Sequence, residues 1–84
     1  MHYVYVLESL LDGGLYIGCT GDLKNRMRCH TNGGVESTRE RLPIELIYYE
    51  ACHNRHDAFR REKYLKTTYG RRYIKRRLRD YFTG

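Results

Sequence analysis

Apolar and aromatic residues form three short runs in the first 51 positions of the chain, and afterwards they recur at helical intervals. Residues 3–10 and 44–51 are rich in β-branched and aromatic side chains, which favour strands, and residues 15–18 form a shorter run of the same kind. Asp12 and Gly13, between the first two runs, form a dipeptide typical of hairpin turns. The first two predicted strands should therefore pair antiparallel.

The segment after this hairpin has the spacing of an amphipathic helix. Leu23 and Met27 lie one turn apart within residues 21–30, so both are expected to face inward. Thr20 is placed to act as the N-cap of this helix. The polar, glycine-containing residues 31–43 that follow are predicted to form a surface loop.

The rest of the chain is predicted to form a third strand and two helices. Ile44, Leu46 and Tyr48 should share one face of the strand over residues 44–51, because side chains alternate along a strand. The first helix covers residues 55–69 behind an Asn54 cap, and a last basic helix covers residues 71–82 after a break at Gly70. The helical residues expected to face the core are Ala58, Leu65 and Tyr69 on the first and Ile74, Leu78 and Tyr81 on the second.

Length and charge limit what the protein can be. A chain of 84 residues forms one domain with a thin core, and its nine tyrosines suit such a core because each ring can be buried with its hydroxyl near the surface. The net charge of +6 favours a polyanionic partner, such as a nucleic acid.

Cysteine usage and the start of the chain indicate a cytoplasmic protein without a membrane partner. Three cysteines without a CxxC pair argue against a disulfide framework. Cys52, His53 and His56 are close in sequence, but a structural zinc site normally needs four well-spaced ligands, so we do not expect one. No apolar run approaches membrane-spanning length, and the first residues lack the basic start and cleavage site of a signal peptide.

Glu62 is the most informative single residue. It follows Ala58 by four positions and precedes Leu65 by three, so it falls within the apolar stripe of its helix. A carboxylate in such a position is costly to bury unless it is paired or bound to a cation. Pairing with a nearby arginine and a metal-binding or catalytic role both remain open at this point.

Tyr5, Tyr16 and Arg26 could converge with Glu62 on one cleft. Tyr5 and Tyr16 fall on adjacent strands, and Arg26 shares a helix face with His30, four residues later. A carboxylate that holds a divalent metal, an arginine that neutralises charge on phosphorus and a phenol that positions or deprotonates a water suit phosphodiester hydrolysis. Gly18 would let backbone or substrate approach closely, or would simply end its strand.

These residues resemble the GIY-YIG endonuclease domain. The resemblance rests on the segments YVY (3–5), YIG (16–18), LKNRMRCH with Arg26, and RREKYLK with Glu62, and it spans nearly the whole chain. It implies an α/β (α+β) fold with a three-stranded antiparallel sheet flanked by helices, in the order β-β-α-β-α-α. It also implies metal-dependent cleavage of DNA, with Mg²⁺ or Mn²⁺ as the cofactor.

The resemblance also implies roles for individual residues. Tyr5 would orient substrate or water, Tyr16 would be the general base or its positioner, and Arg26 would clamp the phosphate. Glu62 would be the single metal ligand, and His30 would contact phosphate or the water network. The residues predicted to contact nucleic acid are Gly18, Lys24, Arg39, Lys66, Arg71, Arg72, Lys75 and Arg76.

Two departures from the family pattern leave the function open. The first motif reads Tyr-Val-Tyr and keeps the functional tyrosine, but no asparagine follows Asn54, where the family usually has one after the glutamate. Arg76 or Arg77 would stand near that amide's place, and an arginine lacks an acceptor. Three candidate functions therefore stay open. They are an endonuclease, a nucleic-acid-binding module with weak cleavage, and a nuclease subunit targeted by a partner protein. Branched and single-stranded DNA are both candidate substrates.

Overall fold

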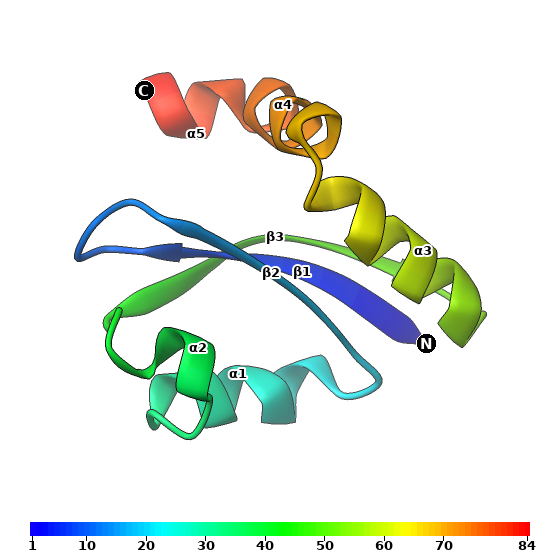
Figure 1. Cartoon of the computed structure of the whole chain (residues 1–84), viewed down its shortest axis with the longest axis horizontal. Coiled ribbons are helices and arrows are strands. Elements are labelled where there is room, and N and C mark those ends of the chain that lie inside the picture. Colours follow the sequence, from blue (N-terminus) through cyan, green and yellow to red (C-terminus); the bar gives the residue numbers. More distant parts are fainter.

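The computed structural model describes all 84 residues, as a three-stranded sheet with helices on both faces (Figure 1). The strands β1 (His2–Ser9), β2 (Leu15–Thr20) and β3 (Ile44–Cys52) lie in the order β2-β1-β3, and both pairs are antiparallel. Gly13 has a positive φ of 74° in the turn between β1 and β2. The predicted hairpin, the third strand and the α+β fold class are confirmed.

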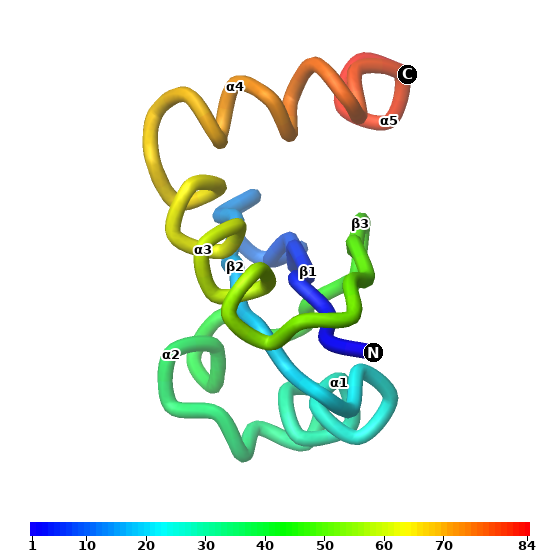
Figure 2. Tube along the Cα trace, turned by 90° about the vertical axis from the view of Figure 1, so that its right-hand side faces the viewer, coloured from blue at the N-terminus to red at the C-terminus, as the bar shows by residue number.

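The helices are divided between the two faces of the sheet. Helices α1 (Leu23–Thr31) and α2 (Glu36–Arg39) lie side by side on one face, as both views show (Figures 1 and 2). On the other face are α3 (Arg55–Leu65), α4 (Thr68–Arg77) and α5 (Arg79–Thr83). The predicted order is found, with two further short helices: α2 lies within the predicted loop, and α5 is the end of the predicted last helix. No helix in the chain is both long and apolar enough to cross a membrane.

The main core lies between β1 and the helices α3 and α4. Val4 and Val6 of β1 point to this face and meet Ala58 and Leu65 of α3 and Ile74 of α4, all at most 2% exposed. Burying an aliphatic side chain of valine size or larger stabilises a fold by about 1.5–3 kcal/mol. The central strand is thereby fixed in place, and the opposite face of β1 presents Tyr3 and Tyr5 toward α1.

The helix ends differ from the prediction at two places. Asp22, rather than Thr20, caps α1, because its carboxylate accepts the Asn25 backbone N–H at 3.1 Å. Thr20 instead hydrogen-bonds to the backbone of Asp22. Residues 31–43 are not entirely a loop, because α2 forms within them.

The boundary between α3 and α4 falls before Gly70 rather than at it. Helix α3 ends at Leu65, and the Thr67 hydroxyl caps α4 by accepting the Gly70 N–H at 3.1 Å. Gly70 is buried, and a Cβ there would overlap the Tyr64 carbonyl oxygen and the Leu65 Cα. The glycine therefore permits close packing of two helices, where the sequence had suggested a helix break.

Two residues predicted to face the core do not, and Tyr48 does not share a face with Leu46 as predicted. Tyr69 is 70% exposed, because the new start of α4 turns it outward, and Tyr81 is 47% exposed while Phe82 packs on the core. Tyr48 lies on the α3–α4 side of the sheet, whereas Leu46 lines a groove on the α1 side. Ile47 has no partner on β1, and this bulge reverses the alternation that the prediction assumed.

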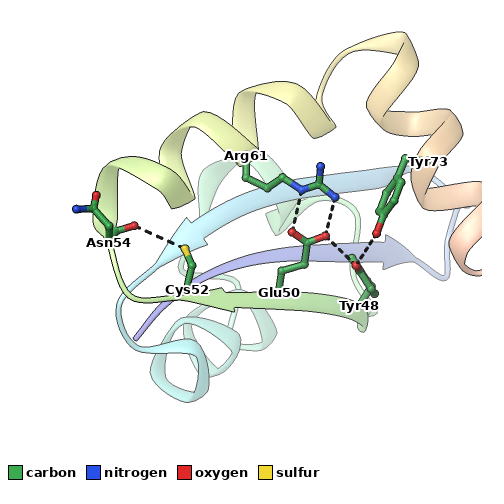
Figure 3. A network of polar contacts seen from close by, with 6 residues as sticks. All are labelled: Tyr48, Glu50, Cys52, Asn54, Arg61 and Tyr73. Atoms are coloured by element: carbon green, nitrogen blue, oxygen red, sulfur yellow. Dashed lines mark hydrogen bonds and ion pairs between the residues drawn. The ribbon is translucent and has the colours of Figure 1, made fainter.

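A polar network joins β3 to α3 and α4 (Figure 3). Arg61 of α3 donates from Nε and Nη2 to the two carboxylate oxygens of Glu50, at 2.8 and 2.9 Å. The Tyr48 hydroxyl donates to Glu50 Oε2 at 2.8 Å and lies 3.5 Å from the Tyr73 hydroxyl of α4. The Arg61 hydrogen bonds lower the pKa of Glu50, and burial raises the pKa of Tyr48. This network fixes the rotation of α3, and therefore the direction of Glu62, the next residue along.

Candidate active site

A cavity of about 500 Å³ lies along the free edge of the sheet, at β2. Groups from α1 and α2 reach it from one face of the sheet, and groups from α3 and α4 reach it from the other. All five predicted catalytic residues and Gly18 are together here. The residues that line it are Tyr5, Leu15, Tyr16, Ile17, Gly18, Cys19, Arg26, His30, Ser37, Glu62, Lys66 and Arg71.

Gly18 creates room for Tyr5 in this cavity. The two residues are directly paired across β1 and β2. A Cβ at position 18 would overlap the hydroxyl and the ring carbon next to it in Tyr5. Gly18 lies inside β2, so it does not end the strand, and its absent side chain lets the phenol reach the cavity.

The Tyr5 hydroxyl is held by two side chains of α1. Arg26 Nε donates to it at 3.3 Å, and His30 Nε2 lies 3.0 Å away. Arg26 and His30 are one helical turn apart, which brings both to the same phenol. Tyr5 is only 3% exposed, so its ring is fixed by packing as well as by these hydrogen bonds.

His30 has a hydrogen-bond partner on each ring nitrogen. Its Nδ1 lies 2.8 Å from the hydroxyl of Thr38 on α2, a side chain that is completely buried. His30 itself is 3% exposed. Burial lowers the pKa of His30, and the Arg26 guanidinium lowers it further. The imidazole is therefore neutral at pH 7.

Glu62 enters the cavity from α3. Its side chain is 20% exposed, and one carboxylate oxygen lies 3.1 Å from the Lys66 ammonium. It approaches Cys19 of β2, whose thiol pKa is raised by burial and by the Glu62 charge. The partner of Glu62 is thus a lysine one turn away, where the sequence had suggested a possible arginine. The chain contains no group of three or more histidine, cysteine, aspartate or glutamate side chains arranged to hold a metal.

Tyr16 lies on the same face of the sheet as Tyr5. It pairs with Leu7, which lies two residues after Tyr5 on β1, so the Tyr5 and Tyr16 side chains are on the same side of the sheet. Its side chain is partly exposed in the cavity wall, and its hydroxyl makes no hydrogen bond within the chain. The Tyr16 hydroxyl is thus free to bind a water or a phosphate oxygen.

The cavity contains some of the residues predicted to contact nucleic acid and leaves out others. Lys66 and Arg71 line it, whereas Lys24 lines a separate groove with Tyr3 and Tyr49. Arg76 lines depressions near the C-terminus and is not part of this cavity. Arg39, Arg72 and Lys75 are exposed outside the cavity.

Three residues of this region were not predicted from the sequence. Thr38 contacts His30, and Ser37 and Cys19 line the cavity. Thr38 and Ser37 sit in a four-residue helix inside a polar segment, where no periodic pattern marks an inward side. Cys19 follows Gly18 directly, and strand alternation could have placed it on the α3 side with Ile17.

The family profile described as the GIY-YIG catalytic domain matches residues 1–77. The chain belongs to the GIY-YIG family. This is a family of nucleases, which implies DNA as the substrate. The profile covers every residue of the cavity.

Bacterial relatives agree with this assignment. A UPF0213 protein of Clostridium perfringens is 43% identical over 67 residues, which cover 79% of this chain and 71% of the relative. One of Streptococcus agalactiae serotype V is 46% identical over 65 residues, covering 76% and 73%. One of Staphylococcus saprophyticus is 37% identical over 67 residues, covering 79% and 80%. No solved structure matches the chain.

Proposed function

We propose that this GIY-YIG protein is a metal-dependent endonuclease that hydrolyses phosphodiester bonds in DNA. One observation carries the proposal. The Tyr5 hydroxyl, bonded to both Arg26 and His30, lines the same cavity as the carboxylate of Glu62. The proton-accepting pair of Tyr5 and His30, the Arg26 guanidinium and the Glu62 carboxylate suit phosphodiester hydrolysis.

Glu62 would hold the divalent cation, Mg²⁺ or Mn²⁺. A single carboxylate fits magnesium, which is usually bound through one or two carboxylates together with waters and substrate phosphates. When bound, the cation would polarise the phosphate and stabilise the charge on the leaving oxygen. Lys66 would then turn from Glu62, 3.1 Å away, toward a phosphate of the substrate.

The cationic side chains of the cavity would bind the phosphate backbone. Arg26 has no carboxylate partner, and its Nε is bonded to Tyr5, which leaves the rest of its guanidinium free. Arg71 reaches the cavity from α4, on the side of Glu62. Arginine suits this role because its planar fork matches phosphate oxygens and always carries its charge.

Tyr5 is better placed than Tyr16 to accept the proton of the attacking water. Its own proton has an acceptor, His30 Nε2 at 3.0 Å, whereas the Tyr16 hydroxyl has none. As the water oxygen bonds to phosphorus, the water proton passes to the Tyr5 oxygen and the Tyr5 proton passes to His30. The bond from phosphorus to the leaving oxygen breaks, and that oxygen takes a proton from solvent. Tyr16 would orient the water or the phosphate.

A second function follows from the missing asparagine. No asparagine occurs after Asn54, and Arg71 is the α4 residue in the cavity. A chain that binds DNA but cleaves it weakly, or only with a partner protein, is the alternative. It predicts DNA binding without metal-dependent cleavage by the isolated protein.

The test is a cleavage assay on supercoiled plasmid, branched DNA and single-stranded DNA, with Mg²⁺, Mn²⁺ or EDTA. Glu62→Gln keeps the shape of the side chain but removes its charge, and Asp57→Asn is the matched control on the same helix, where Asp57 pairs with exposed Arg60. Metal-dependent cleavage that is lost in Glu62→Gln and kept in Asp57→Asn supports the endonuclease. Gel-shift binding without cleavage by any of the proteins supports the alternative.

A further inference from the structure

Thr38 ends a chain of buried hydrogen bonds that begins at the cavity. The chain runs from Arg26 to Tyr5, from Tyr5 to His30, and from His30 to Thr38. Thr38, on a four-residue helix, is the only one of these residues that does not line the cavity, and its side chain is completely buried. Its contribution must therefore pass through His30.

The direction of these hydrogen bonds follows from Arg26, the first residue of the series. A guanidinium only donates hydrogen bonds, so the Tyr5 oxygen accepts from Arg26 Nε. His30 Nε2 is the only acceptor that the protein offers to the Tyr5 proton. His30 Nε2 must then be the unprotonated nitrogen. A neutral imidazole carries its single proton on the other nitrogen, Nδ1, which lies 2.8 Å from the Thr38 hydroxyl.

We propose that Thr38 is a positioning residue, which holds His30 in the Nδ1-protonated form so that Nε2 stays open to the Tyr5 proton. Without the Thr38 oxygen, the buried Nδ1–H has no acceptor, and leaving such a group unpaired is costly. The other form, with the proton on Nε2, donates to the Tyr5 oxygen and blocks transfer from Tyr5. The consequence for cleavage rests on the proposed function, whereas the form of the imidazole does not.

The direct test is the form of the His30 ring, read from imidazole nitrogen chemical shifts in the wild-type protein at neutral pH. Thr38→Val removes the hydroxyl and keeps the shape, and Thr38→Ser restores a hydroxyl. Thr31→Val is the matched control, because Thr31 is exposed on α1 and its hydroxyl bonds only to the Met27 carbonyl. Wild type, Thr38→Ser and Thr31→Val should show the Nδ1-protonated form. Thr38→Val should show the other form or a mixture.

Cleavage by the same four proteins gives the second readout. We expect cleavage to fall about 10- to 100-fold in Thr38→Val, by analogy with the loss found when groups that orient metal-bound histidines are removed, and to recover in Thr38→Ser. A wild-type Nε2-protonated ring overturns the inference, and so does a Thr38→Val protein with unchanged ring shifts. If the shifts follow the expectation and wild type does not cleave DNA, the positioning of His30 stands and the proposed function fails.

Discussion

Gly18 and Tyr5 are paired across β1 and β2, and the Tyr5 ring fills the space that a side chain at position 18 would need. The tyrosine and the glycine of two separate motifs are thus one structural unit. The glycine gives the phenol its position, and Arg26 and His30 then hold its hydroxyl. This relationship explains why an alanine at position 18 should disturb a residue on another strand.

Gly18→Ala should destabilise the fold and move the Tyr5 hydroxyl away from His30. Forcing an extra carbon into a packed site typically costs about 1–3 kcal/mol, and urea unfolding would measure this loss. Gly21→Ala is the control, because the nearest atom to a Cβ there lies 3.8 Å away, at ordinary contact distance. A Gly18→Ala protein as stable as Gly21→Ala would mean that the Tyr5 ring does not occupy this space.

Much of the fold and of the site could be predicted because local signals carry them. The Asp12-Gly13 turn sets the hairpin, and the hairpin brings Tyr5 and Tyr16 to one face. The position of Glu62 in an apolar stripe indicated that it points inward, and its side chain is 20% exposed in the cavity. These features depend on neighbours in sequence, so pattern alone was sufficient.

The features that were missed depend on packing between distant segments. The unpaired Ile47 turns Tyr48 to the other face of the sheet, and nothing in the alternation of β3 marks that position. Gly70 reads as a helix break, but it serves the contact of α4 with the end of α3. Thr38 meets His30 only because α2 folds back beside α1, which no local pattern indicates.

Stability should fall as the pH drops from 7 toward 5, partly because of His30. Burial and Arg26 lower its pKa below the ordinary 6.5, so the unfolded chain takes up this proton before the folded protein does. The free energy of unfolding therefore rises with pH through the window between the lowered value and 6.5, by at most about 1.4 kcal/mol per pH unit. Urea unfolding at several pH values measures the slope.

A histidine variant isolates this contribution. His30→Gln should be less stable at pH 7 and should show a flatter pH dependence between pH 5 and 7. His53→Gln is the control, since His53 is exposed and should leave the wild-type slope in place. An unchanged slope in His30→Gln would show that His30 does not stay neutral through this window.

Arg61→Lys should destabilise the protein although the charge is kept. Lysine cannot reproduce the paired hydrogen bonds to the two oxygens of Glu50 or the stacking over the Tyr73 ring, 4.7 Å from the guanidinium carbon. A hydrogen bond to a charged group contributes about 1.5–3 kcal/mol, so the loss in urea unfolding should be about 1–2 kcal/mol. Arg60→Lys, at an exposed neighbouring position, should change the unfolding free energy by less than about 0.5 kcal/mol. Equal losses of unfolding free energy in Arg61→Lys and Arg60→Lys would show that the hydrogen bonds from Arg61 to Glu50 do not stabilise the fold.

The role of Tyr5 as proton acceptor is tested most directly by the rate of DNA cleavage by Tyr5→Phe, measured with enzyme in excess over substrate. Tyr3→Phe is the matched control, because Tyr3 lies two residues earlier on the same face of β1 and packs edge-on against Tyr49. We expect Tyr5→Phe to slow cleavage about 100-fold or more, the usual effect of removing a proton-transfer group, and Tyr3→Phe to cleave at the wild-type rate. A Tyr5→Phe protein that cleaves as fast as wild type would contradict this role of Tyr5.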